Sequence, residues 1–295
     1  SSSGSTDVAR NLQTDIDLAQ KVSGVDIMIT GHAHQGTPQP LVSNGTLIVS
    51  TDALGIELGK LEISYNTISD KITSYKNTLD YLYDDEVEDD TTVLRVINVW
   101  KQKIMSITDE KVCTASAPLT RSYSEESFLG NIVADAMLYA YPDYDLALTN
   151  SGGLRQDVDA GTVTVGNLIS AFPFPNTVVQ LELTGAEIRE LFEHGARLTN
   201  GVLQVSAGVE MVYDEKKMAG SRMIKCIING KPLEDRRIYR VLTSNFLADG
   251  GDGFTTFRHA KSKKKTNIEI LQTIVTYLKT FDEYIPKKEG RVIKI

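Results

Sequence analysis

The sequence predicts an α+β protein: a short α/β unit, then a lone helix, then a second, self-contained α+β domain. Three observations predict this organisation. An apolar stripe at helical spacing leads directly into a short apolar run, a dense acidic segment interrupts the pattern, and beyond it strand-like runs alternate with helical stripes. A length of 295 residues suits roughly two domains. We place the boundaries at residues 1–83, 84–110 and 111–295.

The first part of the sequence predicts a helix followed directly by a parallel strand. Helix-spaced apolar residues follow Thr6 and stop before Gly24, which is a common helix end. Residues 25–30 come next and are mostly apolar, as is typical of a buried parallel strand. Two further strand-like runs occupy residues 47–50 and 58–65, and the alternation in the second predicts a half-exposed strand. In such α/β units, ligands gather beyond the carboxyl ends of the strands.

The acidic run at residues 84–90 marks a boundary between the two parts. An amphipathic helix follows at residues 92–106. We interpret this acidic run and the basic run at residues 261–265 as solvated loops. The second domain is predicted to contain helices at 129–140, 186–198 and 268–281, and strands at 145–149, 178–183, 205–213, 223–228 and 238–243. Between two of these strands, Asn229-Gly230 predicts a hairpin turn.

Composition excludes several classes of function. The net charge of -8 argues against sequence-independent binding to nucleic acid, because Lys and Arg are not in surplus to neutralise phosphates. Small anionic substrates are compatible with it, since local groups hold them. No apolar run approaches the roughly 20 residues that a membrane helix needs. Cys113 and Cys226 lack ligand spacing and fix no redox compartment. Because neither an initiator Met nor a signal pattern stands at the start, we expect a mature fragment.

Two histidines follow the predicted strand at residues 25–30. In an extended chain, His32 and His34 would face the same side. Neutral imidazole is a common ligand for zinc, manganese and iron. This position, beside the small residue Gly31, suits a metal site. A surface turn that carries two histidines without a special role is the alternative.

Three loops of the second domain have unusual compositions. Residues 149–155 contain paired glycines that let the backbone approach a ligand. In the same loop, Asn150 adds an amide and Arg155 adds a planar fork suited to phosphate or a sugar hydroxyl. A plain glycine-rich turn is the alternative for this loop.

The other two loops each present an aromatic ring. Proline stiffens residues 172–176, so that Phe174 can be presented to solvent at little entropic cost. Residues 245–254 contain three glycines, the ring of Phe246 and the carboxylate of Asp252. Two rings can sandwich a flat base while the polar groups hold its ribose, and stacking contributes about 1–3 kcal/mol per base. The alternative is that the rings plug the hydrophobic core.

Taken together, these motifs resemble the 5'-nucleotidase family, which includes UDP-sugar hydrolases and 2',3'-cyclic-nucleotide phosphodiesterases. Residues 31–34 resemble the last metal motif, GHxH, of the calcineurin-like metallophosphatase domain. Residues 129–136 resemble the family's LGN helix, and the three loops resemble its N-[GS]-GG-[IL]-R, PFxN and NxF-x-GGDG motifs. The resemblance implies the C-terminal part of a metallophosphatase α/β domain, a linker helix and a complete α+β 5'-nucleotidase C-terminal domain.

The resemblance also implies roles for individual residues. By likeness of motif, His32 and His34 would belong to the metal site, with His32 the firmer ligand. The implied nucleotide contacts are base stacking by Phe174 and Phe246, ribose binding by Asp252, and sugar or phosphate contacts by Asn150 and Arg155. Arg121 is the candidate for an arginine that the family uses before the LGN helix, about two residues further upstream than usual.

The implied activity is hydrolysis of nucleotide phosphate esters by a longer parent protein. It would act as a 5'-nucleotidase or 2',3'-cyclic-nucleotide phosphodiesterase, with two divalent ions such as zinc or manganese, in an extracellular, periplasmic or cell-surface location. A nucleotide or nucleoside is the expected partner.

The family's other metal motifs precede the part present here. A further ligand histidine is expected near residues 1–4, where this chain has Ser1, Ser2 and Ser3. We therefore expect the chain alone to be metal-poor and nearly inactive, since two-metal hydrolysis needs a fuller ligand set. In the parent, the domains would swing about the helix at 92–106. A non-catalytic nucleoside-binding module and an adhesion ectodomain are the alternatives.

Overall fold

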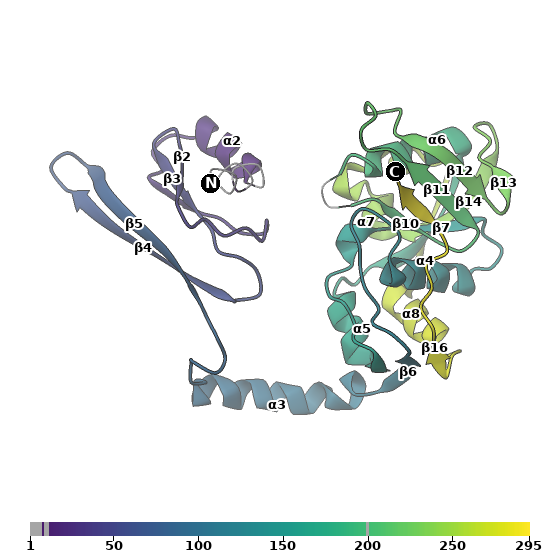
Figure 1. Ribbon diagram of the computed structural model, residues 1–295, viewed down its shortest axis with the longest axis horizontal. Helices are drawn as coiled ribbons and strands as arrows, with labels where there is room; N and C mark the ends of the chain where they lie inside the picture. Colours follow the sequence, from purple (N-terminus) through teal and green to yellow (C-terminus); the bar gives the residue numbers. More distant parts are fainter. Residues whose placement is uncertain (1–7, 9–11, 199–200) are drawn as a thin grey trace. The chain divides into compact units, whose positions relative to one another are not determined.

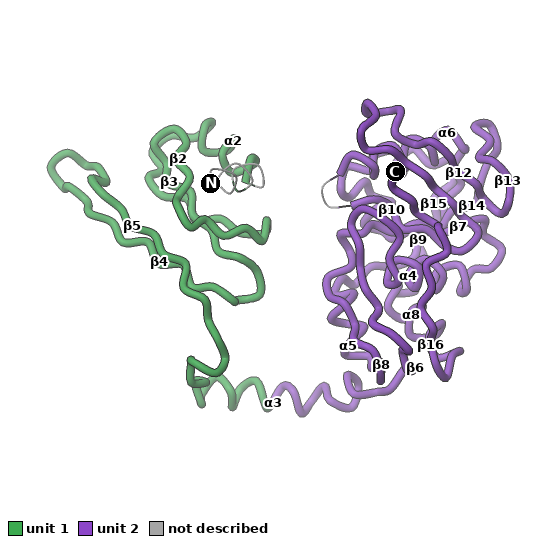
Figure 2. Tube along the Cα trace, viewed as in Figure 1, with its two compact units in different colours: residues 1–98 green, residues 99–295 purple. Residues whose placement is uncertain are grey.

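The computed structural model describes residues 8, 12–198 and 201–295. The chain forms two compact units, residues 1–98 and 99–295, which are coloured separately in Figure 2. The division between them falls inside helix α3 (Thr91–Thr108). Thr6, where the first predicted helix begins, and the serines at positions 1–3 lie outside the described residues.

The first unit contains a small sheet with one helix. Helix α2 (Gln13–Lys21) precedes strands β1 (Ile27–Ile29), β2 (Leu41–Ser43) and β3 (Thr46–Val49), in the sheet order β1-β3-β2. As expected for an α/β unit, β1 and β3 are parallel. The prediction that residues 25–30 form a buried strand is wrong for the end of β1, because the side chain of Ile29 is 84% exposed. The reason is position: β1 is an edge strand, whereas α2 packs against β2 and β3.

A long antiparallel ribbon completes the first unit. Strands β4 (Glu57–Asn66) and β5 (Lys71–Tyr81) pair along their whole length, with a register shift near Tyr65. The sequence predicts β4 but not β5, whose mixed polar and β-branched residues form a strand only through pairing with β4. Most side chains of this ribbon are exposed, and so is the acidic segment at 84–90.

Helix α3 lies where the sequence predicts the lone helix. The carboxylate of Asp90 accepts hydrogen bonds from the amides of Val93 (3.2 Å) and Thr92 (2.7 Å), and these bonds lower the pKa of Asp90. This is the capping expected at a helix N-terminus, where the first amides lack partners within the helix. No residue of α3 is buried. Among the described residues, none of the helices combines the length and apolar character needed to cross a membrane.

A five-stranded sheet forms the centre of the second unit (Figure 1). Its strands, in spatial order, are β10 (Leu203–Val205), β7 (Leu146–Asn150), β14 (Ile238–Ser244), β9 (Thr177–Thr184) and β15 (Ser262–Glu269). β7 runs parallel to β14, while β9 runs antiparallel to it. The basic run at 261–265 is therefore largely part of the edge strand β15, not a loop. Its lysines remain exposed because the strand lies at the edge of the sheet.

Side chains alternate across this sheet and fill two cores, as the period of two in a strand requires. On one face, Ala147, Val178 and Leu242 pack with helices α4 (Phe128–Ala140), α5 (Val165–Ala171) and α8 (Ile270–Leu278). On the other face, Leu146, Val179 and Val241 pack with helix α6 (Gly185–Gly195) and a second sheet. The predicted helices at 129–140, 186–198 and 268–281 correspond to α4, α6 and α8.

Two smaller sheets surround the central one. The first has the order β13 (Lys231–Pro232), β12 (Met223–Ile228), β11 (Val209–Tyr213) and β17 (Val292–Lys294); the second has the order β16 (Glu283–Tyr284), β6 (Lys111–Ala115) and β8 (Gly161–Thr164).

Two sequence predictions meet different outcomes in these sheets. The Asn229-Gly230 turn is confirmed, with φ angles of 51° and 74°, but it pairs β12 with the short strand β13, whereas the predicted strand at 238–243 is β14 of the central sheet. The single strand predicted at 205–213 is wrong. The chain turns at Gly208 (φ +83°), so that β10 and β11 belong to different sheets.

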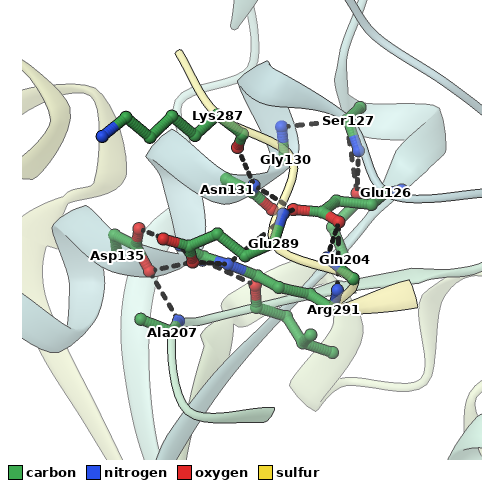
Figure 3. A network of polar contacts seen from close by, with 12 residues as sticks. Glu126, Ser127, Gly130, Asn131, Asp135, Gln204, Ala207, Lys287, Glu289 and Arg291 are labelled. Carbon is green, nitrogen blue, oxygen red and sulfur yellow. Dashed lines mark hydrogen bonds and ion pairs between the residues drawn. The ribbon is translucent and has the colours of Figure 1, made fainter. Parts of the chain in front are cut away.

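A buried polar network fixes the end of the chain to helix α4 (Figure 3). The carboxylate of Glu126 accepts hydrogen bonds from three successive backbone amides, those of residues 289–291, at 2.8–3.0 Å, and from the side chain of Asn131 at 2.7 Å. Burial tends to raise the pKa of Glu126, but these donors outweigh it and lower the pKa below its ordinary value. Nearby, Arg291 donates two hydrogen bonds to Asp135, at 2.7 and 2.8 Å.

Candidate functional site

The three loops that the sequence analysis selects lie at one end of the five-stranded sheet. Because β7 and β14 are parallel, their carboxyl ends, at Asn150 and Ser244, lie at the same end of the sheet. The antiparallel strand β9 begins there, with Val178 opposite Ser244. The loops at 150–155, 172–176 and 245–254 therefore meet although they are far apart in the sequence.

Hydrogen bonds connect the loops after β7 and β14 to each other and to the start of β9. The side-chain amide of Asn150 donates to Oδ2 of Asp252 at 2.8 Å. The side-chain oxygen of Asn245, the first residue of helix α7 (Asn245–Ala248), accepts a hydrogen bond from the amide of Thr177 at 2.8 Å. The first bond joins the loop after β7 to the loop after β14, and the second joins the loop after β14 to the start of β9. The site is thus connected across all three strands.

Phe174 and Phe246 are half-exposed, with 48% and 41% of their surface accessible. They do not plug the core, which excludes that alternative for these two rings. The residues that do plug it are their neighbours in the same loops, Phe172 and Phe254, which are buried. At Gly251, an added Cβ would lie 2.5–2.6 Å from three carbons of the Phe246 ring. Glycine there allows the ring to lie close to the backbone.

A small, solvent-open hollow of about 30 Å³ lies beside Phe174. Its polar lining comes from Thr149, Asn150, Asn176 and Ser244, and its apolar lining includes Phe172 and Leu271. An exposed ring beside amide and hydroxyl groups suits a flat heterocycle with polar edges. Asn176 is not among the site residues selected from the sequence. Its position two residues after Phe174 in the same stiff turn was the available signal.

The two predicted arginines lie together at the loop that follows β7. The amide of Arg155 donates to the carbonyl of Ala171 at 2.9 Å, and its guanidinium donates to the carbonyl of Gly152 at 3.2 Å. Arg121 hydrogen-bonds the Arg155 carbonyl and forms an ion pair with Asp157 at 3.4 Å. Both guanidinium groups are therefore held by this loop, and each retains further N–H donors that could bind an anion.

The loop at 245–254 is also supported from the edge strand β15. Lys263 and Lys265 donate to the two carboxylate oxygens of Asp249, at 2.8 and 3.0 Å, and these bonds lower the pKa of Asp249. In addition, Nε of Arg258 donates to the Asp249 carbonyl at 2.8 Å. The basic run that the sequence analysis assigned to a solvated loop therefore helps to fix the loop that carries Phe246 and Asp252.

In the first unit, the histidine pair is arranged differently from the prediction. His32 and His34 have φ angles of 71° and 52°, and both side chains are exposed. The segment is therefore not extended, because left-handed residues turn the backbone. The prediction that an extended backbone places both rings on one side is wrong. Within residues 8, 12–198 and 201–295, no three His, Cys, Asp or Glu side chains are grouped closely enough to hold a metal ion. The pair does not form a metal site by itself.

Comparison with known proteins identifies relatives of this chain. The sequence profile of the "5'-nucleotidase, C-terminal domain" family matches residues 104–259, more than half of the chain. The trifunctional nucleotide phosphoesterase protein YfkN of Bacillus subtilis is 28% identical over 300 residues, which are 95% of this chain and 20% of that protein. A 5'-nucleotidase of Diplobatis ommata is 27% identical over 95% of this chain and 56% of its own length.

A solved structure extends the likeness to the fold. The 5'-nucleotidase precursor of Thermus thermophilus superposes with a TM-score of 0.82 and 27% identity, over 96% of this chain and 62% of that one. The chain is thus a mixed α/β protein similar to 5'-nucleotidase structures. It spans little more than half of one curated relative and a fifth of the other.

Proposed function

This chain belongs to the 5'-nucleotidase C-terminal domain family, and on that premise we propose that its second unit binds the nucleoside part of a nucleotide whose phosphate ester the parent protein hydrolyses. The observation that carries the proposal is the meeting of three loops at one end of the sheet, with two half-exposed phenyl rings and the Asn150–Asp252 hydrogen bond. The relatives named as nucleotide phosphoesterase and 5'-nucleotidase support the choice of substrate class.

In this proposal the aromatic and polar residues divide the nucleoside between them. Phe174 and Phe246 flank the base. Stacking on a phenyl ring tolerates any base, so the rings alone would not select one nucleotide. The carboxylate of Asp252 accepts hydrogen bonds from the ribose hydroxyls, and Asn150 holds that carboxylate in place. Arg155 and Arg121 bind the sugar or the phosphate through planar N–H groups.

The proposed hydrolysis needs metal ligands beyond those in the described residues. Two divalent ions such as zinc or manganese would activate water and polarise the phosphate. His32 and His34 are the proposed ligands of this chain, but a catalytic zinc ion usually has three protein ligands. Two exposed imidazoles with no third ligand beside them among the described residues do not meet that requirement, so we assign no hydrolytic step to them.

We propose the following organisation of the chain within its parent. Residues 1–83 belong to a metallophosphatase domain, residues 84–110 form a linker and hinge helix, and residues 111–295 form the nucleotide-binding domain. The parent acts as a 5'-nucleotidase or a 2',3'-cyclic-nucleotide phosphodiesterase in an extracellular, periplasmic or cell-surface location.

Calorimetric titration of this chain with adenosine, and separately with inorganic phosphate, tests the nucleoside site. We expect Phe174→Ala and Phe246→Ala each to weaken adenosine binding by about 1–3 kcal/mol, the usual contribution of a stacked base. Phosphate binding should stay unchanged, because it makes no use of the rings. Tyr139→Ala is the control, since it removes another half-exposed ring, on helix α4. Equal weakening for both ligands, or no weakening for adenosine, contradicts the proposal.

A hydrolysis assay separates the enzyme from a non-catalytic nucleoside-binding module. The parent protein and this chain are each incubated with AMP, 2',3'-cyclic AMP and manganese or zinc, and released phosphate or opened cyclic ester is measured. We expect turnover by the parent and almost none by this chain. Adenosine binding without turnover by the parent favours the binding module instead.

A further inference from the structure

The turn that carries Asp252 adopts a backbone conformation that needs support. Asp252 lies within the short turn η2 (Gly251–Gly253), with φ 52° and ψ 21°. Its neighbours Gly250 and Gly253 also have positive φ angles, of 87° and 78°. Glycine enters this region freely, whereas a residue with a side chain enters it at some cost, although aspartate does so more readily than most. Contacts that hold this turn would therefore also favour one direction of the Asp252 carboxylate.

The contact on the backbone side comes from His194, in the last turn of helix α6. Its Nε2 atom lies 2.8 Å from the carbonyl oxygen of Asp252. The same ring meets Phe254 edge to face, with the centroids 4.6 Å apart and the planes at 78°. A Cβ added at Gly253 would lie 3.1 Å from this ring. His194 thus contacts Asp252 in the turn and Phe254 directly after it, and its ring lies beside Gly253.

Arg197 sets which nitrogen of His194 carries the proton. A guanidinium nitrogen of Arg197 lies 2.8 Å from Nδ1 of His194. Because a guanidinium group only donates hydrogen bonds, Nδ1 must accept. In the neutral ring the hydrogen is then on Nε2, which donates to the Asp252 carbonyl. Arg197, His194 and Asp252 form a chain of donors that ends on the turn.

The contact on the side-chain end of Asp252 comes from Asn150, which donates to Oδ2 at 2.8 Å. None of the hydrogen bonds recorded between described residues involves the other carboxylate oxygen, Oδ1. With its backbone held by His194 and one oxygen held by Asn150, Asp252 presents Oδ1 for a further donor. A ribose hydroxyl is such a donor.

We infer that His194 is a positioning residue for Asp252: by donating from Nε2 to the Asp252 carbonyl, it keeps the turn left-handed and the carboxylate directed at the ribose. This inference rests on the proposed function of the site. It assigns a role to helix α6, which contributes none of the residues selected from the sequence. His194 itself makes no contact with the nucleoside in this arrangement.

The test compares two ligands, adenosine and 2',3'-dideoxyadenosine, which differ only in the ribose hydroxyls. Three variants are titrated with both: His194→Phe keeps an aromatic ring without the donor, His194→Gln places an amide donor near the position of Nε2, and Arg197→Met removes the donor to Nδ1. We expect His194→Phe to lower adenosine affinity about tenfold, the effect of one lost polar interaction. Dideoxyadenosine affinity should stay the same.

The conservative variants give graded expectations. His194→Gln should keep adenosine affinity within about threefold of the unsubstituted chain, because one donor replaces another. Arg197→Met should lower it about two- to threefold, because Nδ1 then competes for the proton. A purely structural role for His194 would lower the affinities of both ligands together, and that outcome overturns the inference.

The failure of this inference is distinguishable from the failure of the proposed function. If the unsubstituted chain binds adenosine and dideoxyadenosine equally, Asp252 does not bind the ribose hydroxyls, and the proposed nucleoside site is contradicted. If the unsubstituted chain prefers adenosine and His194→Phe keeps that full preference, the positioning role fails while the site stands. Should His194→Phe not fold, Arg197→Met decides, and an unchanged preference in that variant overturns the inference.

Discussion

The three loops of the second unit and the histidine segment of the first unit differ in how many contacts with other elements hold them in place. Each loop of the second unit is bonded to a residue from another element, as in the Asn150–Asp252 and Thr177–Asn245 hydrogen bonds. The segment of His32 and His34 is exposed, and it contains a local bond from the amide of Ala33 to the carbonyl of Gly31. The second unit therefore organises a candidate binding site with its own residues, whereas the histidine pair is not organised into a site by the described residues.

The same contrast holds for charged groups elsewhere in the two units. In the second unit, Glu126 and Arg291 are almost fully buried and each is saturated with partners. In the first unit, Lys60 and Glu62 form a surface pair at 3.1 Å with both side chains more than half exposed. Breaking a buried network is costly because it leaves desolvated groups unpaired, whereas losing a surface pair costs little. Substitutions of charged residues should therefore destabilise the second unit more than the first.

The largest expected effect comes from Glu126→Gln. The substitution removes a buried charge and places an amide NH₂ group where backbone amides now donate, so unfolding should become easier by about 2–4 kcal/mol. Urea unfolding gives the free energy, and hydrogen exchange read by mass spectrometry assigns it to peptides of each unit. Exchange should accelerate in residues 111–295 and stay unchanged in the ribbon of β4 and β5.

Glu125→Gln is the matched control for this substitution. Glu125 is the adjacent residue and forms an exposed pair with Lys288 at 3.1 Å. Its loss should cost less than about 1 kcal/mol, as for other surface pairs. A cost equal to that of Glu126→Gln would show that the buried network has no special importance.

Acidification should remove the difference in stability to urea between the unsubstituted chain and Glu126→Gln. The pKa of Glu126 is lower in the folded protein than its ordinary value, so its carboxylate stabilises the fold fully above that value, about 4.3. The contribution is lost as the pH falls through the lowered folded pKa. Urea midpoints of the two proteins between pH 7 and pH 3 should converge on the acidic side. Convergence on the alkaline side would contradict the assigned direction.

A smaller effect, on binding alone, is expected from Gly251→Ala. The new methyl group would overlap the Phe246 ring, so the ring must turn, and adenosine affinity should fall by about 1–2 kcal/mol, part of a full stacking contribution. Gly31→Ala, beside the histidine pair, is the control, because a Cβ there meets nothing within 4 Å. Calorimetric titration of both variants with adenosine measures the difference. Unchanged adenosine affinity in Gly251→Ala would show that Phe246 does not need its present position.

The smallest effect should come from His32→Ala and His34→Ala. Both side chains are exposed, so thermal unfolding of either variant should differ from that of the unsubstituted chain by less than about 0.5 kcal/mol. A loss above about 1 kcal/mol would mean that the histidines are structural and would weaken their proposed role as metal ligands.

The longer helices and most central strands of the second unit were predictable because local patterns are enough to specify them, whereas the seven-residue helix α5 was not predicted. The stripes that predict α4, α6 and α8 and the apolar runs of β7 and β14 place these elements within a few residues of their observed bounds. β5 and β15 escaped prediction because polar residues form these exposed strands only by pairing with β4 and β9. Likewise, the turn at Gly208 interrupts a run that reads as one continuous strand.

The candidate site was predictable in its parts but not in its assembly. Glycine, proline, aromatic and amide residues in short loops indicate ligand contact locally, and this selected Asn150, Phe174, Phe246 and Asp252 from the sequence. No local pattern indicates that Asn150 donates to Asp252 across 102 positions, or that the Asp252 carbonyl lies 2.8 Å from a ring nitrogen of His194 in helix α6. The extended conformation expected for His32 and His34 failed for the same reason, since isolated left-handed residues leave no periodic signal.

The sequence by itself determined which segments become the longer helices and most central strands, and where the glycine- and proline-containing loops lie, because side-chain periodicity and the backbone limits of glycine and proline act over a few residues. Only the tertiary structure decided that parallel β7 and β14 and antiparallel β9 bring three loops to one end of a sheet, and that His194 and Arg197 support Asp252. Strand order and direction arise from contacts between distant residues, and those contacts exist only once the chain has folded.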